Sequence, residues 1–318
     1  APADSLNLRA LDPACGSGSF LIRAFERLCE HWQTALIKSD KLRRKTDCWT
    51  DPDTGDLHLT SDLKRRILTA NIYGVDLDPG AVEVTQLSLY LKMLEGESRT
   101  TLARNRELFG SDIPLLPPLQ DNIKCGNSLI ASDFSLNPDD LVRVRAFDWD
   151  EGFREIMKGG GFDAVIGNPP YIQLSMEEFR DDQANAYLKS SFRMSGGRLN
   201  TFILFIEKAR GLTKIGGEFG FIVPNTLLTQ EYYEEARRRL VEHTWVRLLV
   251  SPQGQVFSDA VIENIIIIAQ PMVSPAAKSL ECIFANLEER GLDSAHKVSQ
   301  NDFASNLHTS FMVPTDPA

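Results

Sequence analysis

The sequence predicts an α/β fold with a doubly wound sheet, and three observations lead to this prediction. Short apolar stretches alternate with longer amphipathic ones, which is typical of strands alternating with helices. The first apolar stretch, residues 8–11, runs into a glycine-rich turn and then into a helical pattern. Two later apolar stretches are separated only by residues 251–260, which is too short for a crossover helix. We therefore expect these two strands to pair antiparallel.

Seven strands are expected, at residues 8–11, 72–75, 122–125, 163–166, 219–223, 246–250 and 261–269. Helical patterns occupy residues 19–37, 61–69, 79–94, 201–212 and 231–241. Ser61 or Asp62 is the expected cap of the second of these helices. Residues 38–60 are polar and rich in turn formers, which predicts an insertion after the first helix, and residues 95–120 predict a surface loop.

Composition excludes several classes of protein. The 318 residues suit one large domain or a domain with an appendage, and 42% of them are hydrophobic. No apolar run approaches the roughly 20 residues that a membrane helix needs. Five cysteines without a CxxC pair argue against a zinc site or a disulfide framework, so no metal is expected and a reducing cytoplasm fits best.

The first chemical motif is Asp-Pro-Ala-Cys-Gly-Ser-Gly-Ser-Phe, residues 12–20, where the first strand passes into the first helix. Gly16 and Gly18 allow a tight turn and the close approach of a ligand to the backbone. Free amides at the helix start attract negative groups, including a carboxylate. By itself such a turn occurs in many nucleotide-binding folds.

The second motif places Asp76 at the end of the second strand, in Tyr-Gly-Val-Asp-Leu-Asp-Pro. An acidic side chain at this position can accept hydrogen bonds from both hydroxyls of a ribose. Asp78 directly precedes Pro79 and a helical pattern, so we expect it to cap that helix. The order of the two motifs is that of a nucleotide-binding half.

The third motif is Asn-Pro-Pro-Tyr, residues 168–171, at the end of a buried strand. The prolines restrict the backbone, so that the Asn168 amide and the Pro169 carbonyl can face one amino group. Two acceptors can hold its two hydrogens, and Tyr171 can offer a flat face to a planar ring. Such acceptors localise the lone pair of a conjugated amine as it attacks a methyl group, and no general base is required before attack.

The first motif resembles that of class I S-adenosylmethionine-dependent methyltransferases, and Asn-Pro-Pro-Tyr resembles the signature of amino-methyltransferases. Over residues 8–270 the chain is similar to gamma-order, Eco57I-like DNA methyltransferases specific for N6 of adenine, from restriction-modification and phage-defence systems. The resemblance implies a class I, Rossmann-like α/β fold whose seven-stranded mixed sheet has strand 7 antiparallel. It also implies methyl transfer from S-adenosylmethionine to the exocyclic N6 of adenine in DNA, in a bacterial or archaeal cytoplasm.

The same resemblance assigns roles to single residues. The catalytic residues would be Asn168, Pro169, Pro170 and Tyr171. Cofactor contacts would come from Asp12, Pro13, Ala14, Cys15, Gly16, Gly18, Phe20, Asp76, Leu77, Asn127, Ser128 and Asn168. Tyr171 and Phe257 would stack on the target base.

One of these assignments, and one further resemblance, compete with plainer interpretations. Many relatives carry Asp where this chain has Asn127, and an Asx turn explains the position equally well. Residues 200–205 resemble a segment that lines the cofactor pocket, yet Phe202 and Phe205 fall at helical spacing, so core packing is as good an explanation.

The resemblance also implies partners. The chain begins seven residues before the first strand, so the upstream cofactor motif of this family is not in it, and residues 1–270 would be a catalytic domain cut from a longer protein. Residues 271–318 would be a C-terminal extension or the start of a target-recognition region, and a nuclease could be fused or associated. The partner would be double-stranded DNA with a flipped adenine, without a membrane.

The net charge of −10 is unusual for a protein that contacts phosphates, which calls for a local basic patch or for DNA contacts elsewhere. Three basic runs could form such a patch or simply be solvated faces: Lys41, Arg43, Arg44 and Lys45; Lys64, Arg65 and Arg66; and Arg237, Arg238 and Arg239.

Three alternative functions remain open from the residues alone. Methyltransferases that modify a glutamine amide in a protein also carry Asn-Pro-Pro-Tyr, because an amide nitrogen poses the same lone-pair problem. Cytosine amino methylation is a further variant, although Ser replaces Asn in many such enzymes. A non-catalytic module that binds the cofactor or DNA is the third alternative.

Overall fold

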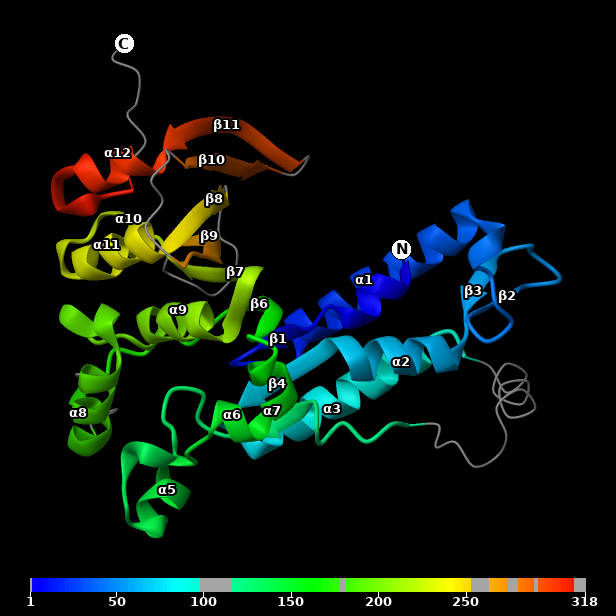
Figure 1. Cartoon of the computed structure of the whole chain (residues 1–318), viewed down its shortest axis with the longest axis horizontal. Coiled ribbons are helices and arrows are strands. Elements are labelled where there is room, and N and C mark those ends of the chain that lie inside the picture. Colours follow the sequence, from blue (N-terminus) through cyan, green and yellow to red (C-terminus); the bar gives the residue numbers. More distant parts are fainter. Residues whose placement is uncertain are drawn as a thin grey trace. The chain divides into compact units, whose positions relative to one another are not determined.

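The computed structural model describes residues 2–97, 116–174, 176–177, 181–252, 263–273, 280–288 and 291–311. The chain folds as two compact units, Ala1–Gly126 and Asn127–Ala318 (Figure 1). Each unit contains parallel strands and helices, and each carries one of the predicted motif groups.

The first unit has a parallel three-stranded arrangement in the order β1-β4-β5. Its strands are β1 (Ala10–Asp12), β4 (Ile72–Asp76) and β5 (Ile123–Cys125). A separate antiparallel hairpin, β2 (Cys48–Thr50) with β3 (Leu57–Leu59), lies within the predicted insertion. Its helices are η1 (Pro2–Asn7), α1 (Ser19–Lys38), η2 (Asp40–Leu42), α2 (Ser61–Asn71) and α3 (Pro79–Leu94).

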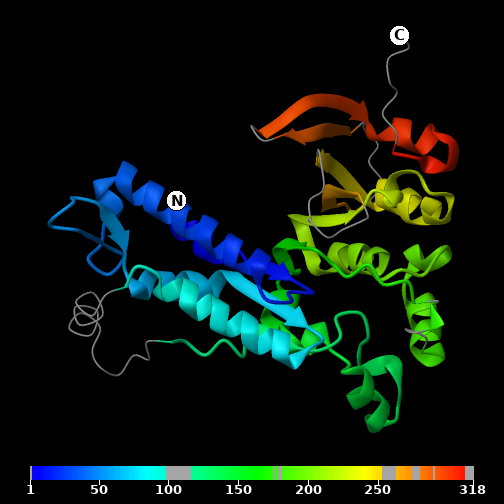
Figure 2. The same cartoon turned by 180° about the vertical axis from the view of Figure 1, so that it is seen from behind.

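The helices of the first unit pack against one another around an apolar core (Figures 1 and 2). Helix α1 buries Leu21, Phe25, Trp32 and Leu36, which lie on one face because their spacing follows the helical period. Asp78 caps α3 as predicted, since its side chain accepts a hydrogen bond from the Gly80 amide at 3.1 Å. The predicted cap of α2 is wrong, because the Thr60 side chain accepts the bond from the Leu63 amide.

The second unit has strands in the order β6-β7-β9-β8-β10-β11. They are β6 (Phe162–Gly167), β7 (Thr213–Pro224), β8 (Thr244–Pro252), β9 (Asn264–Pro271), β10 (Glu281–Glu288) and β11 (Gly291–Ser299). The main helices are α5 (Pro138–Val144), α6 (Trp149–Gly152), α7 (Arg154–Lys158), α8 (Asp182–Ser191), α9 (Thr201–Leu212), α10 (Thr226–Thr229), α11 (Glu234–His243) and α12 (Gln300–Ser305). Short turns of 3-10 helix are η3 (Ser132–Phe134), η5 (Arg193–Gly196), η6 (Glu231–Tyr233) and η7 (Leu307–Thr309).

The pairing of β8 with β9 confirms the antiparallel arrangement expected from the short connection between them. Strand β9 is also antiparallel to β7, so it is inserted between strands that run the opposite way. The predicted class I α/β fold is confirmed, but the count of seven strands is too low. The β2–β3 hairpin was missed because each strand has only three residues, and β10 and β11 were missed because residues 281–299 show little alternation of apolar and polar side chains.

The C-terminal region extends this sheet. Strand β10 pairs in parallel with β8, and β11 pairs antiparallel with β10, so residues 281–299 continue the order of the second unit. These residues fall in the predicted C-terminal extension. Among the helices that the structure describes, none is long and apolar enough to cross a membrane.

Strand β6 ends before its neighbour β7, and this difference creates the place for the Asn-Pro-Pro-Tyr segment. Gly167 pairs with Phe221 at the end of the β6–β7 ladder, while β7 continues to Pro224. The edge of β7 beyond Phe221 is therefore open to the residues that follow β6. Helix α9, whose residues from Thr201 to Ile206 are all buried, begins beside the same segment.

Candidate active site

In the first unit, the glycine-rich turn between β1 and α1 is held by backbone hydrogen bonds. The Cys15 amide donates to the Val75 carbonyl at 3.0 Å, and the Gly18 amide donates to the Cys15 carbonyl at 2.8 Å. Gly16 has φ +53° and Gly18 has φ +85°, which are left-handed conformations that other residues adopt at a cost. The turn therefore needs glycine at both positions for its geometry, and the approach of a ligand to them stays a prediction.

Asp76 joins the two predicted cofactor motifs. Its Oδ2 accepts a hydrogen bond from the Gly16 amide at 2.7 Å, and its Oδ1 accepts one from the Asp78 amide at 2.9 Å. A carboxylate oxygen has more than one acceptor position, so these bonds leave capacity for the hydroxyls of a ribose. The structure thus gives Asp76 a role in holding the turn, and its predicted ribose contact stays a prediction.

Thr85 of α3 supports the same turn and was not predicted from the sequence. Its hydroxyl donates to the Gly16 carbonyl at 2.7 Å, and its side chain is fully buried. A Cβ placed on Gly18 would lie 2.9 Å from the Thr85 methyl carbon, so Thr85 packs directly on the glycine. The available sequence signal was a polar residue on the buried face of α3, between Val82 and Leu89.

Asp12 is buried at the end of β1, with 2% of its surface exposed. Its Oδ1 accepts a hydrogen bond from the Ala14 amide at 3.0 Å. Burial raises the pKa of Asp12 to about 7, the Ala14 amide opposes this rise, and the charge of Asp76 adds to it. Burial also raises the pKa of the Cys15 thiol far above its usual range, so Cys15 is a core residue and not a nucleophile.

The first unit fits the predicted cofactor. Helix α1 starts at Ser19 without a side-chain cap, so its first amides keep their capacity to donate to a carboxylate. A Cβ built on Gly16 would meet no atom within 4 Å, which leaves space for a ligand against the backbone. Of the other predicted contacts, Pro13 is buried, Ala14 and Phe20 are half-buried, and Leu77 is 50% exposed.

In the second unit, Asn127 forms the turn that competed with its cofactor role. Its Oδ1 accepts a hydrogen bond from the Leu129 amide at 3.0 Å, which is an Asx turn. Ser128 is buried, and its carbonyl accepts a hydrogen bond from the Trp149 indole at 3.1 Å. The contact of Asn127 and Ser128 with the cofactor stays a prediction.

The Asn-Pro-Pro-Tyr segment follows β6 along the open edge of β7. The Tyr171 hydroxyl lies 2.7 Å from Asn168 Oδ1 and 3.1 Å from the carbonyl oxygen of Ile222, the residue after the last β6–β7 pair. Burial raises the pKa of Tyr171 to about 12, so the hydroxyl keeps its proton and donates at neutral pH. The hydroxyl thereby directs the amide oxygen of Asn168, a role that sequence reasoning did not assign to Tyr171.

The Tyr171 ring packs on buried aromatic residues. Its centroid lies 6.0 Å from that of Phe202 at an interplanar angle of 82°, and Phe202 in turn meets Tyr233 at 5.2 Å and 76°. Phe202 and Phe205 are 1% and 6% exposed, so both are core residues. Stacking of Tyr171 on a target base stays a prediction, and Phe257 lies outside the described residues.

Comparisons with known proteins decide the family. The family model described as "Eco57I restriction-modification methylase" matches residues 70–257, which is more than half of the 318-residue chain. The chain belongs to the Eco57I restriction-modification methylase family. Asp76 and the whole Asn-Pro-Pro-Tyr segment lie inside the matched residues, so the predicted family resemblance is confirmed.

Two curated relatives illustrate the extent of the similarity. The type II restriction enzyme and methyltransferase RM.Eco57I of Escherichia coli is 30% identical over 80% of this chain and 24% of its own length. The adenine-specific methyltransferase PglX of Streptomyces coelicolor is 24% identical over 71% of this chain and 17% of its own length. This member of the Eco57I methylase family therefore spans about a quarter or less of the length of these relatives.

Two solved structures share the fold. A nuclease-deletion mutant of the Type ISP restriction-modification enzyme LlaGI, in complex with a DNA substrate mimic, has a TM-score of 0.56, 14% sequence identity and coverage of 93% of this chain and 22% of its own. The Type IIL restriction-modification enzyme MmeI in complex with DNA has a TM-score of 0.55 and 17% sequence identity. The match covers 93% of this chain and 35% of the MmeI chain. At 14% and 17% identity these two structures show only that the Eco57I-family chain shares their fold.

The three basic runs differ in how their charges are used. The side chains of residues 41–45 are exposed, and Arg43 pairs with Asp40 at 2.9 Å. The second run is engaged, because Lys64 pairs with Glu97 and both Arg65 and Arg66 pair with Asp62. In the third run Arg238 and Arg239 pair with Glu235.

Arg237, the remaining member of the third run, is fully buried. Its guanidinium donates to the carbonyls of Leu227, Gln230, His308 and Thr309, which fastens the C-terminal residues to α11. Burial lowers its pKa, and the charge of Glu234 opposes this change. Arg237 is therefore a structural residue and no phosphate contact.

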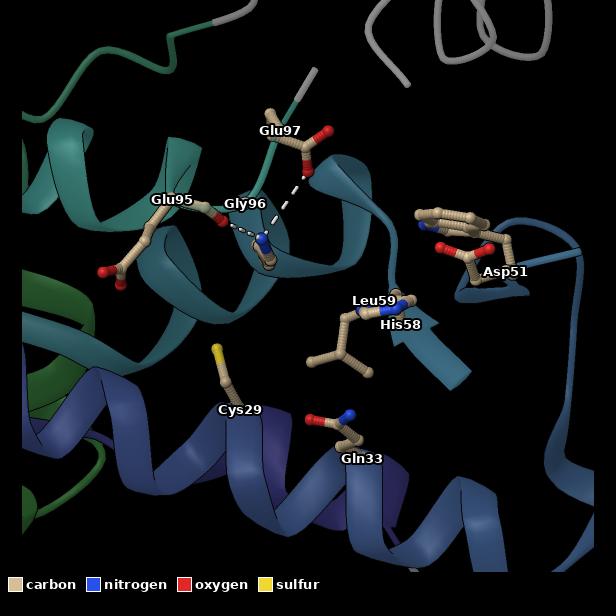
Figure 3. Close-up of a pocket in the computed structure, with 10 residues that line it drawn as sticks. Cys29, Gln33, Asp51, His58, Leu59, Glu95, Gly96 and Glu97 are labelled. Carbon is tan, nitrogen blue, oxygen red and sulfur yellow. Dashed lines mark hydrogen bonds and ion pairs between the residues drawn. The ribbon is translucent and has the colours of Figure 1, made fainter. Parts of the chain in front are cut away.

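A cavity of about 390 Å³ in the first unit lies away from the predicted site residues (Figure 3). Cys29 and Gln33 of α1 line one side, and the stacked Trp49 and His58 rings of the hairpin form another. Lys64 and Glu97 also line the cavity, and the Lys64 ammonium pairs with the Glu97 carboxylate at 3.5 Å. Among the described residues, no three His, Cys, Asp or Glu side chains gather as a metal site.

Proposed function

We propose that this chain is the catalytic module that transfers a methyl group from S-adenosylmethionine to the exocyclic N6 amino group of adenine in DNA. The observation that carries the proposal is the corner formed by Asn168 and Tyr171 at the end of β6. There the single proton of the Tyr171 hydroxyl is shared between the half-buried Asn168 amide oxygen at 2.7 Å and the Ile222 carbonyl oxygen at 3.1 Å, with the shorter contact to Asn168.

Asn168 would act as an acceptor for the target amine. Its Oδ1 receives one hydrogen bond from Tyr171 and keeps a second lone pair, which can receive a hydrogen of the amino group. An acceptor fixed in this way favours the pyramidal nitrogen of the transition state over the planar nitrogen of the free base. The N–C bond would form as the S–C bond of the donor breaks; the Asn168 carboxamide is too weakly basic to take up a proton, so it orients the amine, and the methylated nitrogen releases its extra proton to solvent.

The first unit would bind the methyl donor. S-adenosylmethionine carries an electrophilic methyl group on a positively charged sulfur, which is the chemistry that the amine requires. Asp76 would accept the ribose hydroxyls, and the amides at the start of α1 would receive the carboxylate. The buried Asp12 lies at the same turn and would face the positive charge of this molecule.

DNA is the proposed substrate, and adenine would have to leave the duplex to reach the Asn168 corner. Relatives named as restriction enzymes and methyltransferases, and structures of LlaGI and MmeI with DNA or a DNA mimic, support this choice. Because the chain spans about a quarter of RM.Eco57I, we propose that target recognition and any nuclease reside in other parts of a longer protein. Phe257 would stack on the flipped base.

Nucleoside analysis tests this proposal directly. The complete protein that contains this chain is incubated with labelled S-adenosylmethionine and unmethylated genomic DNA, and the digested nucleosides are separated by chromatography with mass detection. We expect N6-methyladenine to carry the label. Label in N4-methylcytosine, or in a glutamine side chain of added protein, would replace the adenine assignment, and absence of label from every acceptor would refute methyl transfer.

A further inference from the structure

We infer that Thr201 is a positioning residue for the methyl-transfer reaction. Its hydroxyl forms hydrogen bonds to backbone groups on both sides of Tyr171, at Pro170 and Ile172. This inference rests on the proposed function, since it concerns how the Asn168–Tyr171 corner keeps its shape. Thr201 is the first residue of α9 and is 6% exposed.

The Thr201 hydroxyl lies between two backbone groups of the same segment. It donates to the Pro170 carbonyl and accepts a hydrogen bond from the Ile172 amide at 3.0 Å. The Thr201 amide also donates to the Ile172 carbonyl at 3.0 Å. These three bonds join α9 to the residues immediately before and after Tyr171, so they restrict the backbone that aims the Tyr171 side chain.

The flanking residues strengthen the same attachment. The Leu174 amide donates to the Leu199 carbonyl at 3.1 Å, and Gln173 and Asn200 form an isolated antiparallel bridge. Asn200 caps α9 through the Phe202 amide at 3.3 Å. The start of α9 is therefore paired with the chain after Tyr171 along several residues, and Thr201 is the member whose side chain reaches back to Pro170.

The consequence for the reaction follows through Tyr171. The ring of Tyr171 packs against Phe202, the residue next to Thr201, and its hydroxyl directs Asn168 Oδ1. Loss of the Thr201 hydroxyl would leave the half-buried Pro170 carbonyl and Ile172 amide without this partner and would let the Tyr171 backbone shift. Because a misplacement of about 1 Å at a reacting group can cost about 100-fold in rate, a small shift suffices.

Thr201→Val, Thr201→Ala and Thr201→Ser in the complete chain separate this role from ordinary stability. Valine keeps the shape and loses the hydroxyl, alanine avoids any steric conflict, and serine keeps the hydroxyl. We expect kcat for DNA methylation to fall about 10- to 100-fold in the valine and alanine variants, with the Kd for S-adenosylmethionine nearly unchanged, and serine to restore it to within about threefold. Thr244→Val is the matched control, since Thr244 is fully buried and donates to the Leu240 carbonyl at 2.6 Å.

A double-mutant cycle with Tyr171→Phe supplies the second readout. If Thr201 acts through Tyr171, the combined variant loses little more activity than the more damaging single variant. Additive losses, or a valine variant with wild-type kcat, would overturn the inference. Should Thr201→Val fail to fold, the alanine and serine pair decides: equal kcat values for these two would equally overturn it. An inactive wild-type protein would instead count against the proposed function.

Discussion

Removing one oxygen atom from Tyr171 tests the corner without disturbing its packing. Tyr171→Phe keeps the ring that meets Phe202 and removes the hydroxyl that lies 2.7 Å from Asn168 Oδ1 and 3.1 Å from the Ile222 carbonyl. The hydroxyl has one proton to share between these two acceptors: a net hydrogen bond contributes about 0.5–1.5 kcal/mol, and an acceptor left without its partner costs up to about 1–3 kcal/mol where it is shielded from water. Part of this loss falls on the transition state, because the Asn168 amide becomes free to rotate.

A loss of about 1–2 kcal/mol in transition-state stabilisation corresponds to a rate reduced about 5- to 30-fold, since 1.36 kcal/mol is a factor of ten. The assay is single-turnover methyl transfer to DNA at saturating labelled S-adenosylmethionine, with cofactor affinity measured by calorimetry. We expect the rate to fall and the affinity to remain. Because the pKa of Tyr171 is raised to about 12, its hydroxyl adds no pH dependence between pH 6 and about pH 9.

Tyr90→Phe is the matched control for this experiment. The Tyr90 hydroxyl also donates to a carbonyl, that of Pro117 at 2.6 Å, but it lies away from the predicted site residues. We expect a similar loss of stability and no loss of single-turnover rate. If Tyr171→Phe methylates at the wild-type rate, the hydroxyl does not orient Asn168 and this part of the reasoning fails.

Three further predictions, two of them with a control variant, address the cofactor turn and the buried arginine. Burial raises the pKa of Asp12 from its ordinary value of 3.8 to about 7 in the folded chain. The folded state therefore keeps this proton to a higher pH than the unfolded state, and the wild type loses stability as the pH rises from about 4 to about 7. Asp12→Asn should therefore be more stable above pH 7, by on the order of 1–4 kcal/mol without cofactor, and urea melts at pH 4 and pH 8 in which this advantage does not grow would contradict the assignment. Gly18→Ala should lower the free energy of unfolding by more than about 1–2 kcal/mol, because φ is +85° and the new Cβ meets a side chain at 2.9 Å. Gly16→Ala meets nothing within 4 Å and should lose less stability, so an equal loss would speak against the contact. Arg237→Met should lower the free energy of unfolding by about 3–5 kcal/mol in the same melts, whereas Arg238→Met, at an exposed position, should lower it by less than about 1 kcal/mol. The reverse order would refute the structural role of the buried Arg237 guanidinium.

Capping residues and prolines made the bounds of some helices predictable to the residue. Pro79 after Asp78 marked the start of α3, and the predicted range of α9 agrees with the structure because Asn200 caps it. Where several cap formers stand together, the sequence could not choose among them. Thr60 caps α2 through the Leu63 amide, whereas the neighbouring Asp62 pairs with Arg65 and Arg66.

The supports of the site were not predictable, because their partners are distant in the sequence. Thr85 reaches Gly16 and Thr201 reaches Pro170, and no spacing rule connects either pair. The motifs identified the residues proposed to touch the ligands, since chemistry restricts residue type there. A buried threonine that holds a carbonyl leaves no local pattern and becomes visible only in the folded chain.

The central claim is that the Asn168 amide oxygen holds the amine that is methylated. The most direct measurement compares N6-methyladenine formed by wild type, Asn168→Ala and Asn168→Asp in the complete protein, with binding of S-adenosylmethionine measured in parallel. Alanine removes the acceptor, whereas aspartate keeps an oxygen in reach of Tyr171. The account predicts no methyladenine with alanine, a reduced amount with aspartate and cofactor binding in both; undiminished methylation by Asn168→Ala would contradict it.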